Sequence, residues 1–329
     1  MPSLAAAATE KALVTAGYGR HYLVRPATPA EASDAATDDR SEQRQRTGEL
    51  IAVTRGKRTD PCVGDRVRIR AVGDDQAVIE SIEARRNEIR RSDRWRSKLL
   101  AANIDQVGIV LAGDPPFSEE LLLRMLAASD AASVPAALVA NKSDLVEASA
   151  AVASRLAVYQ ALGLKVFAVA AGSDQQATRD SLRDWLAGRT TLLIGQSGMG
   201  KSTLVNALVP DAELRTQTIS EALASGRHTT TFSRLFDLPA EHAPDARIVD
   251  TPGFQTFGIA PLSSSQLVHA MPEFAPHLGR CRFNDCTHRD EPDCAIRAAA
   301  EAGEIDARRL QLYGRLVDET LRNPSRPRP

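Results

Sequence analysis

The sequence predicts a multidomain protein with an N-terminal β-barrel, a central α/β domain and a mostly α-helical C-terminal domain that holds a metal. Three observations support this division. Short strands separated by glycine turns occupy residues 10–84, apolar runs alternate with helical patterns from Ile104 onward, and three cysteines and a histidine gather within residues 281–294. We place the domains at residues 1–93, 94–258 and 259–329.

The composition indicates a globular protein without a membrane segment. Hydrophobic residues make up 43% and charged residues 25% of the chain, and the formal net charge of −1 gives no overall basic field for nucleic acid. No apolar run is long enough to span a membrane, and the first residues lack the pattern of a secretion signal. We therefore expect no membrane contact. Because three of the four cysteines gather beside a histidine, a metal site in a reducing compartment is favoured over the disulfide framework of a secreted protein, and we expect a cytoplasmic protein. We also expect it to be a monomer.

The N-terminal strands are expected to close into a small barrel. Lys11–Val24 breaks into two strands at Gly17-Tyr18-Gly19, and Gly48–Val53 and Ala77–Ile82 predict further strands. Between Gly48–Val53 and Ala77–Ile82, apolar side chains alternate with arginines over residues 66–71. Short strands with glycine turns are typical of closed barrels, of which the OB-fold is one common type. Residues 26–47 have no apolar periodicity and are expected to form a flexible loop.

The central domain is expected to contain a mostly parallel sheet covered by helices, because apolar strand-like runs alternate with helical patterns. The strand candidates are Val107–Ala112, Ala136–Ala140, Val166–Ala170, Thr191–Ile194 and Arg247–Val249. The helical candidates are Glu119–Ala128, Ala148–Leu162, Ser181–Leu186 and Lys201–Leu208.

A phosphate-binding loop lies between the fourth strand and the fourth helix of this domain. Residues 195–202 fit the pattern G-x-x-x-x-G-K-[ST], in which glycines let backbone N–H groups surround the phosphates and the helix N-terminus adds partial positive charge. Lys201 is expected to reach the β- and γ-phosphates and the Ser202 hydroxyl to ligate magnesium. The predicted nucleotide contacts here are Gly195, Gln196, Ser197, Gly198, Met199, Gly200, Lys201, Ser202 and Thr203.

A second phosphate motif, Asp250-Thr251-Pro252-Gly253, follows the last strand. The D-x-x-G pattern alone is common in turns, but at a strand end downstream of a phosphate loop it predicts a nucleotide switch. Asp250 is expected to hold magnesium through water, and the Gly253 N–H to sense the γ-phosphate.

The nucleotide base is expected to be guanine. Asn141-Lys142-Ser143-Asp144 ends a strand and fits N-K-x-D, in which the carboxylate accepts from the guanine N1–H and exocyclic amine. Adenine would leave this acceptor unpaired, at a cost large enough to select bases. The expected GTP contacts are Asn141 at the base edge, Lys142 along the loop, Ser143, and Asp144. Because this motif precedes the phosphate loop, whereas most GTPases have the reverse order, the domain is predicted to be circularly permuted.

Residues 226–231, Gly-Arg-His-Thr-Thr-Thr, lie between the two phosphate motifs. A hydroxyl of Thr229 or Thr230 could complete the magnesium shell, as switch I does in other GTPases; the alternative is a polar loop before a strand at 232–236. Phe254 stands where many GTPases carry a water-orienting glutamine, so intrinsic hydrolysis should be slow. His228 is the nearest candidate for this task, with Gln255 as fallback, unless His228 is only a solvated loop residue. The predicted catalytic residues are therefore His228, Lys201 and Gly253.

The C-terminal cysteines predict one structural zinc per chain. Cys281, Cys286, His288 and Cys294 supply three thiolates and one imidazole, a closed tetrahedral set with no open position for catalysis. Little apolar sequence surrounds them, so the metal is expected to replace a core. Cys62 is interpreted as an ordinary strand-end cysteine.

Two basic stretches remain, and each is consistent either with phosphate contacts to RNA or with a solvated face. One is residues 85–98, which include Trp95. The other is the C-terminal helix and tail, in which Ile305, Leu312, Leu316 and Leu321 mark one apolar face and the basic residues are Arg308, Arg309, Arg315, Arg322, Arg326 and Arg328.

Taken together, these motifs resemble the circularly permuted, ribosome small-subunit-dependent GTPases of bacteria, the RsgA or YjeQ family. The resemblance rests on residues 102–106, 114–117, 141–144, 195–202, 228–231 and 250–254 and on the cysteine–histidine spacing. It implies an RNA-binding OB-fold domain, a permuted GTPase domain and a zinc domain. It also implies a factor that binds the small ribosomal subunit and its rRNA late in maturation and hydrolyses GTP there, with a catalytic part for His228. The alternative function is a GTP switch acting on another RNA, with incidental hydrolysis.

Overall fold

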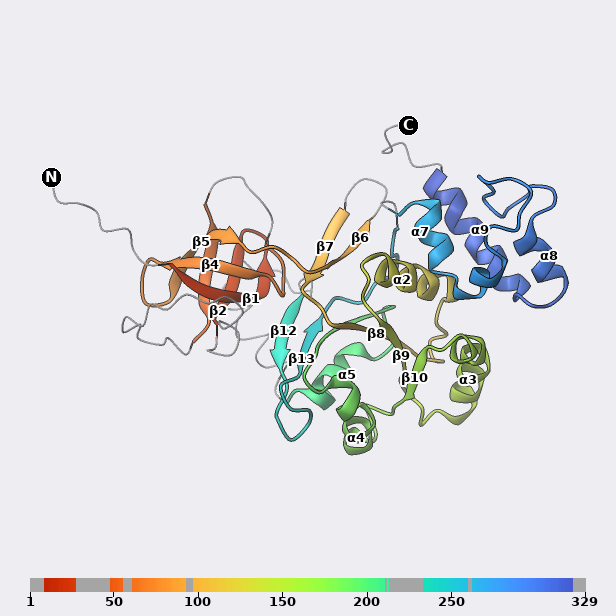
Figure 1. Cartoon of the computed structure of the whole chain (residues 1–329). Coiled ribbons are helices and arrows are strands. Elements are labelled where there is room, and N and C mark those ends of the chain that lie inside the picture. Colours follow the sequence, from red (N-terminus) through yellow and green to blue (C-terminus); the bar gives the residue numbers. More distant parts are fainter. Residues whose placement is uncertain are drawn as a thin grey trace.

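The computed structural model describes residues 9–27, 48–55, 61–92, 97–210, 212, 233–259 and 262–321. Figure 1 shows three parts along the chain, with the N-terminal strands at one end, the α/β domain in the middle and the last helices at the other end. This arrangement confirms the predicted fold class. None of the described helices is long and apolar enough to cross a membrane.

The N-terminal part is a closed five-stranded barrel. Its strands are β1 (Glu10–Tyr18), β2 (His21–Pro26), β3 (Leu50–Thr54), β4 (Arg66–Ala71) and β5 (Gln76–Ile82), hydrogen-bonded in the order β1-β2-β3-β5-β4, with β4 pairing back to β1. Val14, Val24, Ala52, Val67 and Ile69 are fully buried and fill the interior. The predicted alternation in β4 is confirmed, because Val67 and Ile69 point inward while Arg66 and Arg68 are exposed.

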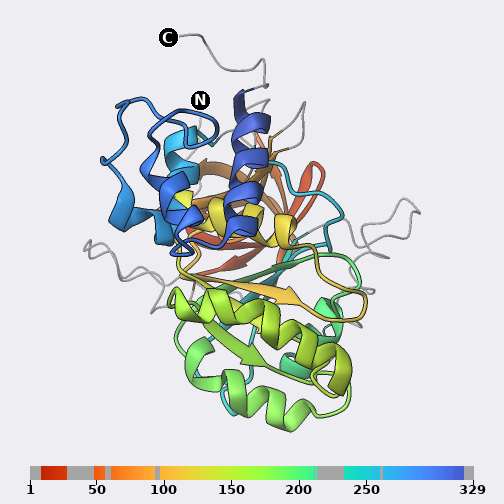
Figure 2. The ribbon, with the colours of Figure 1, turned by 90° about the vertical axis from the view of Figure 1, so that its right-hand side faces the viewer.

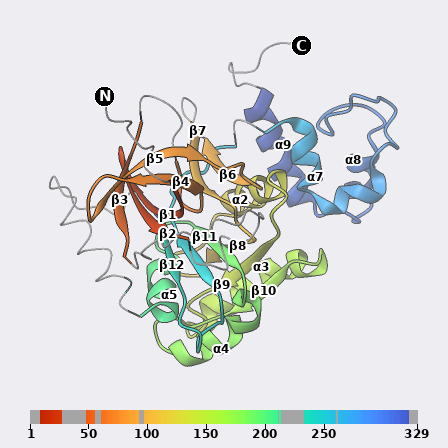
Figure 3. The ribbon, with the colours of Figure 1, turned by 60° about the vertical axis from the view of Figure 1, so that its left-hand side comes forward.

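The central sheet has the order β10-β9-β8-β11-β13-β12. The strands are β8 (Gln106–Leu111), β9 (Ala136–Ala140), β10 (Lys165–Ala168), β11 (Thr190–Gly195), β12 (Arg234–Asp237) and β13 (Arg247–Asp250), all parallel except β12. Every residue of β8 is buried, as expected for a central parallel strand covered on both faces. At the sheet edge, Arg234 of β12 pairs with Ala16 of β1, which joins the sheet to the barrel (Figure 3).

Helices cover this sheet. They are α2 (Glu119–Ala131), α3 (Val146–Ala161), α4 (Gln175–Leu186) and α5 (Lys201–Leu208). The α2 helix packs on β8 and β9, α5 packs on β11 and β13, and α4 packs against α5. The four predicted helices are confirmed, although α4 begins earlier than expected because Asp174 caps its N-terminus by accepting from the Ala177 N–H.

A two-stranded hairpin, β6 (Glu88–Ser92) and β7 (Ser97–Ala102), connects the barrel to the central sheet. The sequence indicated only a basic link here, because arginines hide the strand pattern. Ile89, Leu100 and Ala101 are nevertheless buried and anchor the hairpin. The predicted domain limit between residues 93 and 94 falls between β6 and β7 of this hairpin. The three domain limits remain predictions.

The C-terminal part consists of α7 (Ser264–His269), the 3-10 helix η1 (Pro272–His277), α8 (Ala295–Glu301) and α9 (Ala307–Leu321). The expectation that a metal replaces its core is wrong. Phe274, Ile296, Leu312 and Leu316 are buried and belong to the same continuous core as the central domain. Leu321, predicted on the buried face, is 47% exposed, because that face ends at Thr320.

Ion pairs also hold the C-terminal helices against α2, and Figure 2 shows α9 lying beside it. Arg124 of α2 pairs with Glu319, and the Arg308 guanidinium lies 2.8 Å from the Glu119 carboxylate. Arg309 is 2% exposed and pairs with Glu273. Arg308 and Arg309, two of the basic residues that the sequence offered as RNA contacts, are therefore paired within the protein.

Candidate nucleotide site and metal site

The phosphate loop joins the end of β11 to the first turn of α5, as predicted. Gly198 and Gly200 adopt φ values of +88° and +78°, in the left-handed region that favours glycine. At Gly195 a Cβ atom would lie 2.4 Å from the Val110 carbonyl oxygen. These three positions therefore require glycine, and they leave the loop's backbone N–H groups next to the helix N-terminus, where they can surround an anion.

The D-x-x-G segment runs alongside the phosphate loop. The Phe254 N–H donates to the Gly195 carbonyl, and the Ser197 N–H donates to the Phe254 carbonyl, both at 3.0 Å. The Lys201 ammonium is paired with the Asp250 carboxylate, and a Cβ on Gly253 would lie 3.0 Å from the Ser197 Cα. The predicted phosphate, magnesium and switch residues thus meet at one place, although the sequence separates them.

Phe254 cannot position a water molecule, since its side chain is turned into the core. The ring is 3% exposed and packs edge-on against Phe257, with ring centroids 5.4 Å apart. Gln255, the fallback candidate, is exposed and lines a cavity of about 420 Å³ between α2, α9 and residues 255–258. No phosphate-loop residue lines that cavity, so Gln255 does not face the phosphate loop there.

Asn141 ties three loops of the site together. Its Nδ2 donates to the carbonyls of Met199 and Gly200, both at 3.2 Å, and its Oδ1 accepts from the Ala171 N–H at 3.1 Å. The side chain is 4% exposed. The sequence suggested only a contact with the base edge, whereas the structure shows Asn141 positioning the phosphate loop and residues 169–172.

Two other residues of this motif hold its loop against neighbouring segments. The Ser143 N–H donates to the Val169 carbonyl at 3.0 Å, and Lys142 Nζ donates to the Asp114 carbonyl at 2.6 Å. Asp144 is exposed, and no hydrogen bond or ion pair joins its carboxylate to any other residue within the described ranges. This carboxylate is therefore free to accept from a base.

Switch I lies outside the described residues. His228, Thr229 and Thr230 all fall there, so their roles stay predictions. Among the described residues, Gln196 has a connecting role that its motif does not predict. Its Oε1 accepts from the Ser118 N–H at 2.9 Å, and Ser118 is the N-cap of α2. Ser118 followed by two glutamates is a recognisable helix-start signal, but nothing in the sequence shows that Gln196 reaches it.

The predicted metal ligands come together. The donor atoms of Cys281, Cys286, His288 and Cys294 all lie within 4.8 Å of one another. The Sγ atoms of Cys281 and Cys294 are 3.9 Å apart, and each is 3.5 Å from His288 Nδ1. Four ligands at ordinary zinc distances would place sulfurs about 3.8 Å apart and a sulfur and a nitrogen about 3.6 Å apart. The observed distances therefore fit a tetrahedral zinc ion.

The loop that carries His288 is fixed by a carboxylate. Glu291 accepts from the N–H groups of Thr287 and Arg289, at 2.8 and 2.9 Å, and from the Thr287 hydroxyl. Although burial acts in the opposite direction, these hydrogen bonds lower the Glu291 pKa to about 2. Burial lowers the His288 pKa, which keeps the imidazole neutral, as a metal ligand must be.

Comparison with known proteins agrees with this site. The model of the RsgA GTPase family matches residues 82–260. The protein called "Small ribosomal subunit biogenesis GTPase RsgA" of Ralstonia pickettii (strain 12J) is 44% identical over 315 residues, covering 96% of this chain and 94% of that protein. Its namesake in Paraburkholderia phytofirmans (strain DSM 17436 / LMG 22146 / PsJN) is 46% identical over 308 residues, covering 93% and 92%.

Solved structures show the same fold. The crystal structure of YjeQ from Thermotoga maritima superimposes with a TM-score of 0.68 at 25% identity, covering 96% of this chain and 99% of that chain. The structure of YloQ, described as a circularly permuted GTPase, gives a TM-score of 0.65 at 23% identity and covers 100% of both chains.

Proposed function

Because this chain belongs to the RsgA family of GTPases, we propose that it binds the small ribosomal subunit late in its maturation and hydrolyses GTP to GDP and phosphate there. The observation that supports this most directly is its similarity, over almost its whole length, to proteins named for small-subunit biogenesis. The alternative of a switch acting on another RNA is not favoured, since no other function is named among these relatives.

We assign the nucleotide contacts to the residues that the fold brings together. Asp144 reads guanine, while the loop from Gly195 to Thr203 and the N–H of Gly253 hold the phosphates. Lys201 neutralises charge on the β- and γ-phosphates. The ion pair between Asp250 and Lys201, the residue before Ser202, supports a shared role of Ser202 and Asp250 in binding magnesium. A magnesium ion held there by Ser202 and Asp250 would further reduce the phosphate charge.

Hydrolysis in this proposal depends on the partner. The buried Phe254 offers nothing to the attacking water, so another group must position it. We assign this task to His228, with Thr229 or Thr230 completing the magnesium shell. Since subunit binding would bring this group to the phosphates, GTP turnover should be coupled to the maturing subunit.

The C-terminal cluster is proposed to hold one zinc ion per chain, with a structural role, since all four ligand positions are protein side chains. The monomeric state and a cytoplasmic location, where small subunits mature, belong to the same proposal.

Co-sedimentation with purified ribosomal subunits tests the partner. The chain loaded with a non-hydrolysable GTP analogue should pellet with small subunits and not with large ones, and the GDP form should pellet less. Equal recovery with both subunits, or equal recovery of both nucleotide forms, would contradict the proposal.

A further inference from the structure

The β6–β7 hairpin touches the segment that leaves the D-x-x-G switch. The Ser92 N–H donates to the Gly258 carbonyl at 2.9 Å. The Arg91 Cζ lies 5.1 Å from the centroid of the Phe254 ring, within the range of a cation–π contact. Both contacts come from β6 and reach the few residues after Gly253. A main-chain hydrogen bond and a guanidinium–ring contact thus connect the hairpin to the switch.

Phe254 connects the hairpin to the phosphate loop. Its N–H donates to the Gly195 carbonyl, and its own carbonyl accepts from the Ser197 N–H. Its ring packs edge-on against Phe257. In a close-packed interior the ring cannot shift without moving its own backbone. A displacement of the ring would therefore move both the phosphate loop and the adjoining Gly253 N–H.

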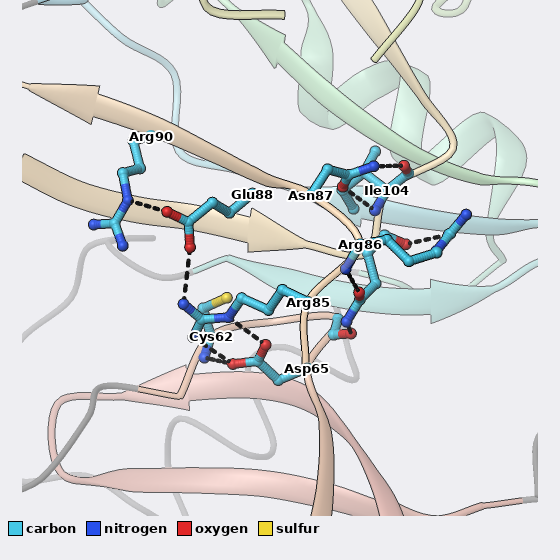
Figure 4. Close-up of polar contacts among 10 residues, drawn as sticks. Cys62, Asp65, Arg85, Arg86, Asn87, Glu88, Arg90 and Ile104 are labelled. Atoms are coloured by element: carbon cyan, nitrogen blue, oxygen red, sulfur yellow. Dashed lines mark hydrogen bonds and ion pairs between the residues drawn. The ribbon is translucent and has the colours of Figure 1, made fainter. Parts of the chain in front are cut away.

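Arg91 contacts an aromatic ring, whereas the neighbouring Arg85 and Arg90 pair with carboxylates. Arg90 donates to Glu88 at 2.6 Å, and Arg85 pairs with Asp65 at 2.7 Å (Figure 4). Within the described ranges, no carboxylate pairs with Arg91. Lys98 lies opposite it across the hairpin, and its pKa is lowered by burial and by the Arg91 charge. Among the described residues, the favourable contact of the Arg91 guanidinium is therefore the one with the Phe254 ring.

The hairpin is in turn fixed to the barrel. Arg85, which precedes β6, donates to both carboxylate oxygens of Asp65, a fully buried side chain just before β4. Just after the end of β7, Asn103 Nδ2 donates to the Gly64 carbonyl at 2.9 Å, and its Oδ1 accepts from the Arg86 N–H. A ligand that shifts the barrel must therefore shift the hairpin as well.

We propose that Arg91 is a positioning residue that transmits the placement of the barrel and hairpin to the GTPase switch through the Phe254 ring. It does not touch the nucleotide; it sets where Phe254, and with it Gly253 and the phosphate loop, are held. This inference rests on the proposed function, since it describes how a bound subunit reaches the reaction centre.

The test compares Arg91→Gln with Arg90→Gln. Both variants remove one positive charge from β6, but only the first removes the contact with Phe254. In single-turnover GTP hydrolysis at saturating small subunits, Arg91→Gln should lower the stimulated rate about three- to tenfold relative to the parent. Arg90→Gln should keep the parental rate, and Arg91→Lys, which retains a cation over the ring, should recover part of the loss. Equal stimulated rates in Arg91→Gln and Arg90→Gln would overturn the proposal.

Two further measurements keep this inference separate from the choice of partner. In a Phe254→Leu background, Arg91→Gln should cause no additional loss, and a further loss of the same size would exclude the ring as the route. Hydrogen exchange of the Phe254 and Ser197 amides in the free protein should be faster in Arg91→Gln and unchanged in Arg90→Gln. If small subunits fail to stimulate the parent, the proposed function fails, and the exchange rates still decide the role of Arg91.

Discussion

Replacing Asn141 with alanine should loosen the base-reading loop, the phosphate loop and residues 169–172 together. The side chain is 4% exposed, so water does not replace its three hydrogen bonds in the native state. Each such bond contributes about 0.5–1.5 kcal/mol net. Because both Nδ2 bonds are long, at 3.2 Å, we expect a total loss of about 2 kcal/mol.

That loss should appear in both unfolding and nucleotide binding. In a domain of this size, 2 kcal/mol lowers the midpoint of thermal unfolding by about 4–8 °C. The Met199 and Gly200 carbonyls lose the hydrogen bonds from Asn141. The phosphate loop is then less well preorganised, and the affinity for a fluorescent GTP analogue should fall about tenfold. Differential scanning calorimetry and fluorescence titration measure the two effects.

Asp144→Ala is the matched control in the same motif. Its exposed carboxylate has no partner in the described part of the chain, so the variant should unfold at the parental temperature while losing guanine affinity. If Asn141→Ala unfolds and binds GTP like the parent, Asn141 does not hold the three loops, and the account of the site is wrong.

Four other predictions concern separate parts of the molecule. Asp144→Asn should weaken GTP binding and favour xanthine nucleotides; competition in which ATP equals GTP for the parent would exclude guanine reading. Gly195→Ala should abolish nucleotide binding, since its Cβ would lie 2.4 Å from the Val110 carbonyl, whereas Gly172→Ala, whose Cβ meets Thr203 Cγ2 at 3.7 Å, should bind normally. Metal analysis should find one zinc in the parent and less in Cys286→Ser; full zinc in that variant would refute the ligand assignment. Glu291→Gln should weaken the hydrogen bonds that fix the loop around His288 and so lower zinc affinity about tenfold, which chelator competition measures. An unchanged affinity would show that Glu291 is not needed to position this loop.

The sequence predicted the parts of this protein whose signals are local. Glycines at 195, 198 and 200 are needed by the loop's own backbone, and the strand before them continues through Leu192, Leu193 and Ile194, so a short pattern was sufficient. The same holds for the metal ligands, which lie within one short segment, and for the alternation of Val67 and Ile69 with arginines in β4.

What the sequence did not show depends on contacts between distant elements. Arg308 lies far in sequence from its partner Glu119, and Arg85 from Asp65, so their charges looked available for RNA although both are paired within the protein. The β6–β7 hairpin was missed because Ile89 is the only apolar residue of β6. Asn141 was assigned to the base alone, since nothing in its motif shows that the phosphate loop lies within reach.

Single-turnover GTP hydrolysis with and without purified small ribosomal subunits tests the central claim most directly. The free protein should hydrolyse GTP slowly, because the Phe254 ring is buried beside the phosphate loop and positions no water. Small subunits should raise the rate by at least about tenfold, since a missing water-positioning group is typically responsible for two or more orders of magnitude, and large subunits should have no effect. A free protein as fast as the subunit-bound one, or equal stimulation by both subunits, would contradict the account.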